Sequence, residues 1–191
     1  MKIYFYLILF TFIVTGFIAD NTITVDKEEA QKAFAILKEI RNNPNKYFRE
    51  LSFDKDLKTS TIQLRWNDTL VKVAERKAYH MANRNYFEHV DPDGYGINYF
   101  IDKSGYELNP EWTRRKSDNY FESLTANLSS GEEAIKYLIK DNLTPTLGHR
   151  KHLLGIDKWN STLTDIGIGF IRRDTGSTYK SYICVIIAKH N

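Results

Sequence analysis

The stretch LRWNDTLVKVAERKAYHMANRNYFEH, residues 64–89, carries the strongest helical pattern in the chain and indicates how the rest is organised around it. Its apolar side chains recur at three- and four-residue spacing, so they share one face of a helix. This stripe consists of Leu70, Val73, Ala74, Ala78, Met81 and Ala82. We therefore predict a helix over about residues 67–86, ending before the turn-forming sequence Asp91-Pro92-Asp93-Gly94.

Helical spacing recurs on both sides of this stretch. Two capping-box patterns, which mark helix starts, begin at Asp26 and Ser130. The first of these helices ends at Asn42-Asn43-Pro44, a stop signal. Beyond the central helix, the sequence predicts helices over residues 26–42, 97–103, 134–141 and 144–154. Residues 46–63 are interpreted as a loop, with a short helix as the alternative, and residues 107–119 as a polar loop.

Aromatic and β-favouring residues predict three strands. The first covers residues 120–127, and the other two, 164–172 and 179–189, are joined by a turn around Gly176. Helices come first and a strand hairpin closes the chain, which favours an α+β fold with an antiparallel sheet over a βαβ repeat. The length of 191 residues suits one domain with its own core.

The N-terminal residues follow the order of parts of a signal peptide. Lys2 supplies a positive start, residues 3–18 are almost wholly apolar, and polar sequence begins at Asp20. We expect residues 1–19 to be a signal peptide and residues 20–191 to be one domain, secreted or periplasmic, with no stable membrane span after cleavage. The alternative is an uncleaved anchor, although the apolar run is slightly short for a bilayer span.

Composition narrows the possible partners. The 27 Lys and Arg residues nearly balance 24 Asp and Glu residues, and a net charge of +3 with mixed signs argues against a nucleic-acid partner. Cys184 is the only cysteine, so no intramolecular disulfide can form. The usual hydrolase motifs and the glycine-rich phosphate and dinucleotide motifs are all missing, which weakens an enzymatic interpretation.

Two acids fall where the pattern predicts inward-facing positions. Asp141 shares a helix face with Leu138, and Glu122 alternates in step with Leu124 along its strand. A carboxylate on a buried face needs a cation, a hydrogen-bond donor or a metal as its partner.

His89 and His149 are the candidate partners of these acids. Two imidazoles and two carboxylates meeting on one face would form a plausible site for a divalent cation such as Zn²⁺. The alternatives are plainer: each histidine ties a loop to a helix, Glu122 lies on a solvated strand, and Asp141 pairs with a neighbouring lysine.

Several motifs, taken in order, resemble the CAP superfamily of cysteine-rich secretory, antigen 5 and plant pathogenesis-related proteins. The central helix followed by Phe87-Glu88-His89 resembles the family's long helix and first histidine, and Asp91-Pro92-Asp93-Gly94 the turn of bacterial members. The stretch from Gly148 to Leu154 resembles the second-histidine motif, and residues 166–170 and 182–185 the closing strands. The match covers roughly residues 32–189.

The resemblance implies an α-β-α sandwich with a central antiparallel sheet and a cleft built by two histidines and two acids. By motif, His89 and His149 take the histidine places and Glu122 the first acid, while Asp141 falls at the second acid by counting along the helix. Some members coordinate a divalent cation there. The chain departs from the family pattern at Phe121 and Ser123, where Gly and Asn usually flank the first acid, and it lacks the disulfides of the eukaryotic branch.

The function that follows from the resemblance is an exported CAP domain whose cleft binds a divalent cation and a small or lipidic ligand. Because no nucleophile–base pair is visible, binding is favoured over enzymatic activity. A metal-assisted hydrolase, with Glu122 or Asp141 as the base, is the first alternative. The second is a non-catalytic structural or interaction module that uses another surface.

Overall fold

The computed structural model describes residues 22–143 and 145–191. The expected signal peptide, residues 1–19, lies outside the described residues. Within these two ranges, no helix combines the length and the apolar character that a membrane span requires.

A five-stranded sheet runs through the centre of the described part of the chain. Its strands follow the order β1-β4-β5-β3; β2 pairs with β4 in parallel, and the other pairings are antiparallel. Both long strands are buried over nearly their whole length, because helices cover both faces of the sheet. The strands are β1 (Ile23–Val25), β2 (Arg65–Trp66), β3 (Glu122–Ala126), β4 (Asp165–Arg173) and β5 (Ser181–Ala188).

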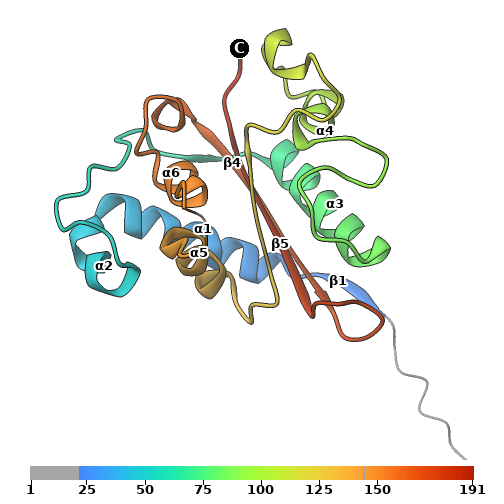
Figure 1. Ribbon diagram of the computed structural model, residues 1–191, viewed down its shortest axis with the longest axis horizontal. Coiled ribbons are helices and arrows are strands. Elements are labelled where there is room, and N and C mark those ends of the chain that lie inside the picture. Colours follow the sequence, from blue (N-terminus) through green and yellow to red (C-terminus); the bar gives the residue numbers. More distant parts are fainter. Residues whose placement is uncertain (1–21, 144) are drawn as a thin grey trace, which may run out of the picture.

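The helices lie in two layers around this sheet. Figure 1 shows α3 on one side of the strands and α1, α5 and α6 on the other. This arrangement confirms the predicted α-β-α sandwich with its central, largely antiparallel sheet. The helices are α1 (Lys27–Asn42), α2 (Pro44–Leu51), α3 (Asp68–Arg84), α4 (Ile97–Lys103), α5 (Gly131–Lys140) and α6 (Gly148–Leu154), with short 3₁₀ turns at Pro110–Thr113 and Asn160–Thr162.

The central helix α3 forms where the sequence predicts it. The side chain of Asn67 accepts hydrogen bonds from the backbone N–H groups of Thr69 and Leu70, at 3.0 and 3.1 Å, and so caps the first turn. Asn85 ends the helix in the left-handed conformation, with φ +53°. All six residues of the apolar stripe are buried.

Other elements differ from the prediction in extent. Helix α2 occupies residues 44–51 and overlaps the stretch from residue 46 that is interpreted from the sequence as a loop, with a short helix as the alternative. It begins at Pro44, which is well suited to the first turn of a helix. Helix α6 begins at Gly148 rather than at residue 144, which itself is not described. Strands β1 and β2 have three and two residues, too few for a sequence period to reveal them.

Candidate functional site

His89 and Glu122 form a hydrogen-bonded pair at the edge strand β3. Nδ1 of His89 lies 2.8 Å from Oε2 of Glu122. The side chain of Glu122 is 0% exposed and that of His89 is 46% exposed, so a buried carboxylate holds an imidazole that reaches solvent. Because a carboxylate only accepts hydrogen bonds, we assign the proton to Nδ1, which leaves Nε2 as the open ring nitrogen.

His149 and Asp141 form a second pair with the same chemistry. Nδ1 of His149 lies 2.8 Å from Oδ1 of Asp141. The side chain of Asp141 is 2% exposed and that of His149 is 27% exposed. Both predicted acids are therefore buried, and each holds the histidine that the sequence offered as a candidate partner.

The position of Asp141 follows from the ends of two helices. It is the residue after α5, in the left-handed conformation with φ +48°, rather than part of that helix's apolar face. Its Oδ2 accepts hydrogen bonds from the backbone N–H groups of His149 and Arg150, at 2.9 and 3.3 Å. These are unpaired donors of the first turn of α6, whose own cap residue, Leu147, has no accepting side chain. Asp141 thus caps α6 and fixes its histidine.

Arg150, within α6, joins this helix to the ends of α5 and α2. Its guanidinium donates to the carbonyl oxygens of Ile139 and Lys140, both at 2.7 Å, and to that of Leu51 at 3.3 Å. These bonds satisfy carbonyl groups that the end of a helix leaves without partners. Hydrogen bonds made by Asp141 and Arg150 therefore fix the backbone around the second pair.

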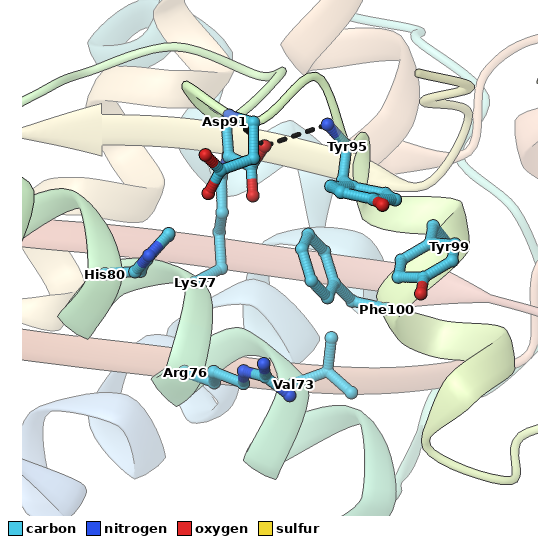
Figure 2. Close-up of a pocket in the computed structure, with 9 residues that line it drawn as sticks. Val73, Arg76, Lys77, His80, Asp91, Tyr95, Tyr99 and Phe100 are labelled. Atoms are coloured by element: carbon cyan, nitrogen blue, oxygen red, sulfur yellow. Dashed lines mark hydrogen bonds between the residues drawn. The ribbon is translucent and has the colours of Figure 1, made fainter. Parts of the chain in front are cut away.

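The loop that carries His89 is held from below by α3. Nζ of Lys77, a buried side chain, donates to the backbone carbonyls of Glu88 and His89, both at 2.8 Å. After the histidine, the carboxylate of Asp91 accepts from the N–H groups of Asp93 and Tyr95, at 2.9 and 2.8 Å, and closes the predicted turn. Figure 2 shows Lys77 rising from α3 towards Asp91 and the bond from Asp91 to Tyr95.

A hollow of about 510 Å³ borders the second pair. Asp141 and His149 line it directly, and so do Phe87, two residues before His89, and Leu124, two residues after Glu122. Most of its remaining lining is apolar or aromatic, from Ala126, Tyr137, Leu143 and Tyr179. The hollow thus combines a polar end with an apolar wall.

The four predicted site residues form two pairs. Across residues 22–143 and 145–191, no group of three or more His, Cys, Asp or Glu side chains is arranged to hold a metal ion. The joint binding of a cation by all four residues therefore stays a prediction. A separate hollow of about 290 Å³ lies between α3 and α4, and its lining includes none of the four residues (Figure 2).

Buried polar groups continue behind the first pair. The Cys184 thiol donates to the other oxygen of Glu122, at 3.6 Å. Burial raises the pKa of this thiol well above its usual value, so Cys184 stays protonated, in keeping with the small buried residue that the sequence predicts. Next to Glu122 in sequence, the Ser123 hydroxyl lies 2.8 Å from Nδ1 of buried His152.

Part of this framework was not predicted from the sequence. Lys77 lies among the buried residues of α3, between Ala74 and Ala78. A lysine on the apolar face of a helix needs a partner inside the protein, so the sequence contained a signal for its role. The hollow had no such signal, because residues such as Phe87 and Leu143 come from different loops and gather only through the fold.

Comparisons with known proteins agree with this architecture. The chain resembles the solved structure of an extracellular protein containing an SCP domain from Bacillus anthracis str. Ames, with a TM-score of 0.54 and 21% identity over 86% of this chain. The match covers 41% of that protein, so this chain spans less than half its length. An outer surface protein from Borrelia burgdorferi gives a TM-score of 0.54 and 17% identity, over 88% of this chain and 98% of that one.

At these identities the likeness to solved structures establishes the fold alone. A search of curated protein sequences gives no match. The model of the cysteine-rich secretory protein family, CAP, matches residues 37–187, which include α3, both histidine–acid pairs and the closing strands. The chain therefore belongs to the CAP family.

Proposed function

We propose that this protein is an exported CAP domain that binds a divalent cation through its two histidine–carboxylate pairs and a small amphipathic ligand in the hollow beside the second pair. An extracytoplasmic location, secreted or periplasmic, is supported by the N-terminal sequence pattern. It is also supported by the two similar structures, one described as extracellular and the other as an outer surface protein.

One observation carries the cation proposal. In both pairs a buried carboxylate holds Nδ1, so each imidazole has a fixed orientation and an open Nε2. Metal-binding histidines commonly donate their second ring N–H to a carboxylate in this way, which fixes the tautomer and raises the basicity of the ligand. Each imidazole therefore has the orientation of a metal-binding histidine, which supports a cation held by His89 and His149, with Glu122 and Asp141 orienting them.

Neutral imidazole ligands suit Zn²⁺ and similar divalent transition metals. Water or a bound ligand would complete the coordination. When bound, Zn²⁺ would supply a Lewis-acidic centre that polarises an oxygen of the ligand.

The ligand proposal comes from the apolar wall of the hollow. Leu143 is 82% exposed and Tyr137 is 47% exposed, and both line it. Large apolar side chains gathered at a hollow mark a binding surface more often than a solvated one. With Lys140 and His149 beside them, they favour a molecule with an apolar chain and a polar or anionic head, such as a lipidic acid.

Zinc titration tests the cation proposal. We expect saturating Zn²⁺ to raise the melting temperature of the protein by about 5 °C or more, since a ligand at 100 times its Kd contributes about 2.7 kcal/mol. A double His89→Ala/His149→Ala variant should lose this shift. A His190→Ala variant, which removes an imidazole stacked on Tyr106, should keep it. Equal shifts in wild type and the double variant would refute the site.

Binding of a dansyl-labelled fatty acid tests the ligand proposal. Wild-type protein should enhance the probe's fluorescence, and Leu143→Asp should weaken binding by about tenfold, because it places a charge on the apolar wall. A Tyr79→Ser variant removes an exposed tyrosine of α3 outside this hollow and should bind like wild type. Equal binding by all three proteins would exclude the hollow as the lipid site.

A metal-assisted hydrolase stays the first alternative to this binding function. Ser123 and His152 form a hydroxyl–imidazole pair, but their exposures are 1% and 6%, so the hydroxyl is not presented to a substrate. The carboxylates of Glu122 and Asp141 are engaged in holding histidines. Both facts favour binding over catalysis.

A further inference from the structure

Arg41 is a buried cation with two unpaired donors. It lies in the last turn of α1, and the residue is 7% exposed. Its Nε and Nη2 atoms are buried and have no hydrogen-bond partner among the described residues. Within the same part of the chain, it is the one charged side chain with buried nitrogens left in this state.

This state is costly for a protein. Burying a guanidinium without acceptors forfeits its hydration and gains nothing in return. Arg150 is similarly buried, yet it donates to three backbone carbonyls. Burial lowers the pKa of Arg41 to about 10, which still leaves the side chain protonated at neutral pH. A charge is therefore present without a counter-charge from the described residues.

Arg41 also lines a hollow of about 380 Å³ between the end of α1 and residues 56–63. Its lining includes Lys58, Asn45 and Thr61, whose side chains can all donate hydrogen bonds. Asp56 is the one acid in this lining, against two basic side chains. The hollow thus has an excess of positive charge and several side chains that can donate hydrogen bonds.

We propose that this hollow binds a small oxyanion, the carboxylate or phosphate group of a small molecule, with Arg41 as its main ligand. Nε and Nη2 lie on one edge of the planar guanidinium and present two roughly parallel N–H groups. That edge is the one that holds a carboxylate or phosphate through two hydrogen bonds. Lys58, at the same hollow, adds a second positive charge for the anion.

Entry of the anion requires a small movement of the segment from Asp56 to Gln63. A Cβ atom placed on Gly155 would lie 3.1 Å from Nη2 and 2.7 Å from Cβ of Ser60, so Gly155 lies close to both this nitrogen and Ser60. Ser60 is held by its hydroxyl bond to the Ser161 carbonyl, at 3.0 Å, and by a backbone bond to Leu154, also at 3.0 Å. None of the four histidine–acid residues lines this hollow, so the proposal is independent of the cation site.

Anion-dependent melting tests the proposal. Wild-type protein is titrated with inorganic phosphate and, separately, with acetate, at constant ionic strength maintained with sodium chloride. We expect at least one anion to raise the melting temperature saturably, by about 3 °C or more. Arg41→Met, which keeps the apolar stem and removes the charge, should lose this response. Arg76→Met, which removes an exposed guanidinium lying over the Phe100 ring, should retain it.

Other outcomes overturn the proposal. It fails if neither anion gives a saturable shift, or if Arg41→Met responds as wild type does. If Arg41→Met does not fold, an NMR titration of ¹⁵N-labelled wild-type protein with the same anions takes its place, and the Arg41 Nε–H resonance is followed. That resonance must move saturably with one of the anions, and an unchanged resonance refutes the site.

Discussion

At the scale of single residues, the candidate site depends on buried groups that hold exposed ones. Glu122 and Asp141 are almost fully buried, whereas the histidines that they hold reach solvent. Lys77 plays a similar part for the backbone of the His89 loop. The orientation of both imidazoles therefore comes from buried carboxylates behind them.

Lys77→Met should destabilise the protein and loosen the His89 loop. The substitution leaves two carbonyl groups without their donor, and each unsatisfied buried group costs about 1–3 kcal/mol. Urea denaturation should show a lower free energy of unfolding, and hydrogen exchange should be faster at residues 88–91. Lys72→Met, at an exposed position on the same helix, is the control. Equal unfolding free energies for the two variants would show that these hydrogen bonds contribute little.

Because of His152, the protein should lose stability as the pH falls from 6.5 to 4. Burial lowers its pKa to about 4 in the folded protein, with smaller contributions from His149 and Arg41. The unfolded chain takes up a proton near pH 6.5 and the folded protein does not, so unfolding is favoured as the pH falls through this window. The stability is fully present above pH 6.5, and up to about 3 kcal/mol of it is lost by pH 4.

His152→Gln should lack this component of the pH dependence. The free energy of unfolding, measured by denaturant titration at half-unit pH steps, should fall less steeply for the variant than for wild type. Carboxylates titrate in both proteins, so the difference between the two curves isolates His152. Parallel curves from pH 7 to pH 4.5 would contradict a neutral, buried His152.

At the scale of elements, the sheet and α3 approach one another through glycine. A Cβ atom on Gly167 would lie 2.2 Å from the backbone of Leu70, and one on Gly169 would lie 2.4 Å from that of Ala74. The alternating glycines of β4 thus let the backbone of α3 rest on the strand. Because α3 leads into the His89 loop, this contact sets the distance between the first histidine and β3.

Gly169→Ala should therefore destabilise the protein more than its small added volume suggests. The methyl group meets backbone atoms, which cannot move aside alone, so we expect a loss of about 1–3 kcal/mol or more in the free energy of unfolding. Gly148→Ala is the matched control, because its added methyl group meets only Thr146 Oγ1 at 3.8 Å. A chemical denaturation midpoint for Gly169→Ala as high as that of Gly148→Ala would contradict the close packing.

Elements with a strong local signal could be predicted from sequence, and those fixed by tertiary contacts could not. Helix α3 forms where a helix was predicted, at residues 67–86, because the apolar stripe and the N-cap residue Asn67 indicate the same helix. Strand β2 has two residues and exists only through its pairing with β4. Asp141 was chosen as an inward-facing residue of a helix, yet it is buried because it caps the next helix.

At the scale of the whole molecule, the sandwich brings together segments far apart in the chain. Glu122 follows His89 by 33 residues, and each pair combines a side chain from one element with the end or loop of another. The sequence and the family resemblance could name the four side chains. Their division into two pairs, and the apolar wall beside them, are consequences of how α5, α6 and β3 pack.

The absorption spectrum of the protein with Co²⁺ tests whether the two histidines share one cation, since Co²⁺ replaces Zn²⁺ and its visible bands report the coordinating atoms. We expect bands of nitrogen- and oxygen-coordinated Co²⁺ to appear, to saturate at one ion per chain and to disappear in the His89→Ala and His149→Ala variants. Thiolate charge-transfer bands should be absent, since Cys184 is buried and protonated. A spectrum identical to that of Co²⁺ in buffer, or one unaffected by loss of either histidine, would refute a shared cation site.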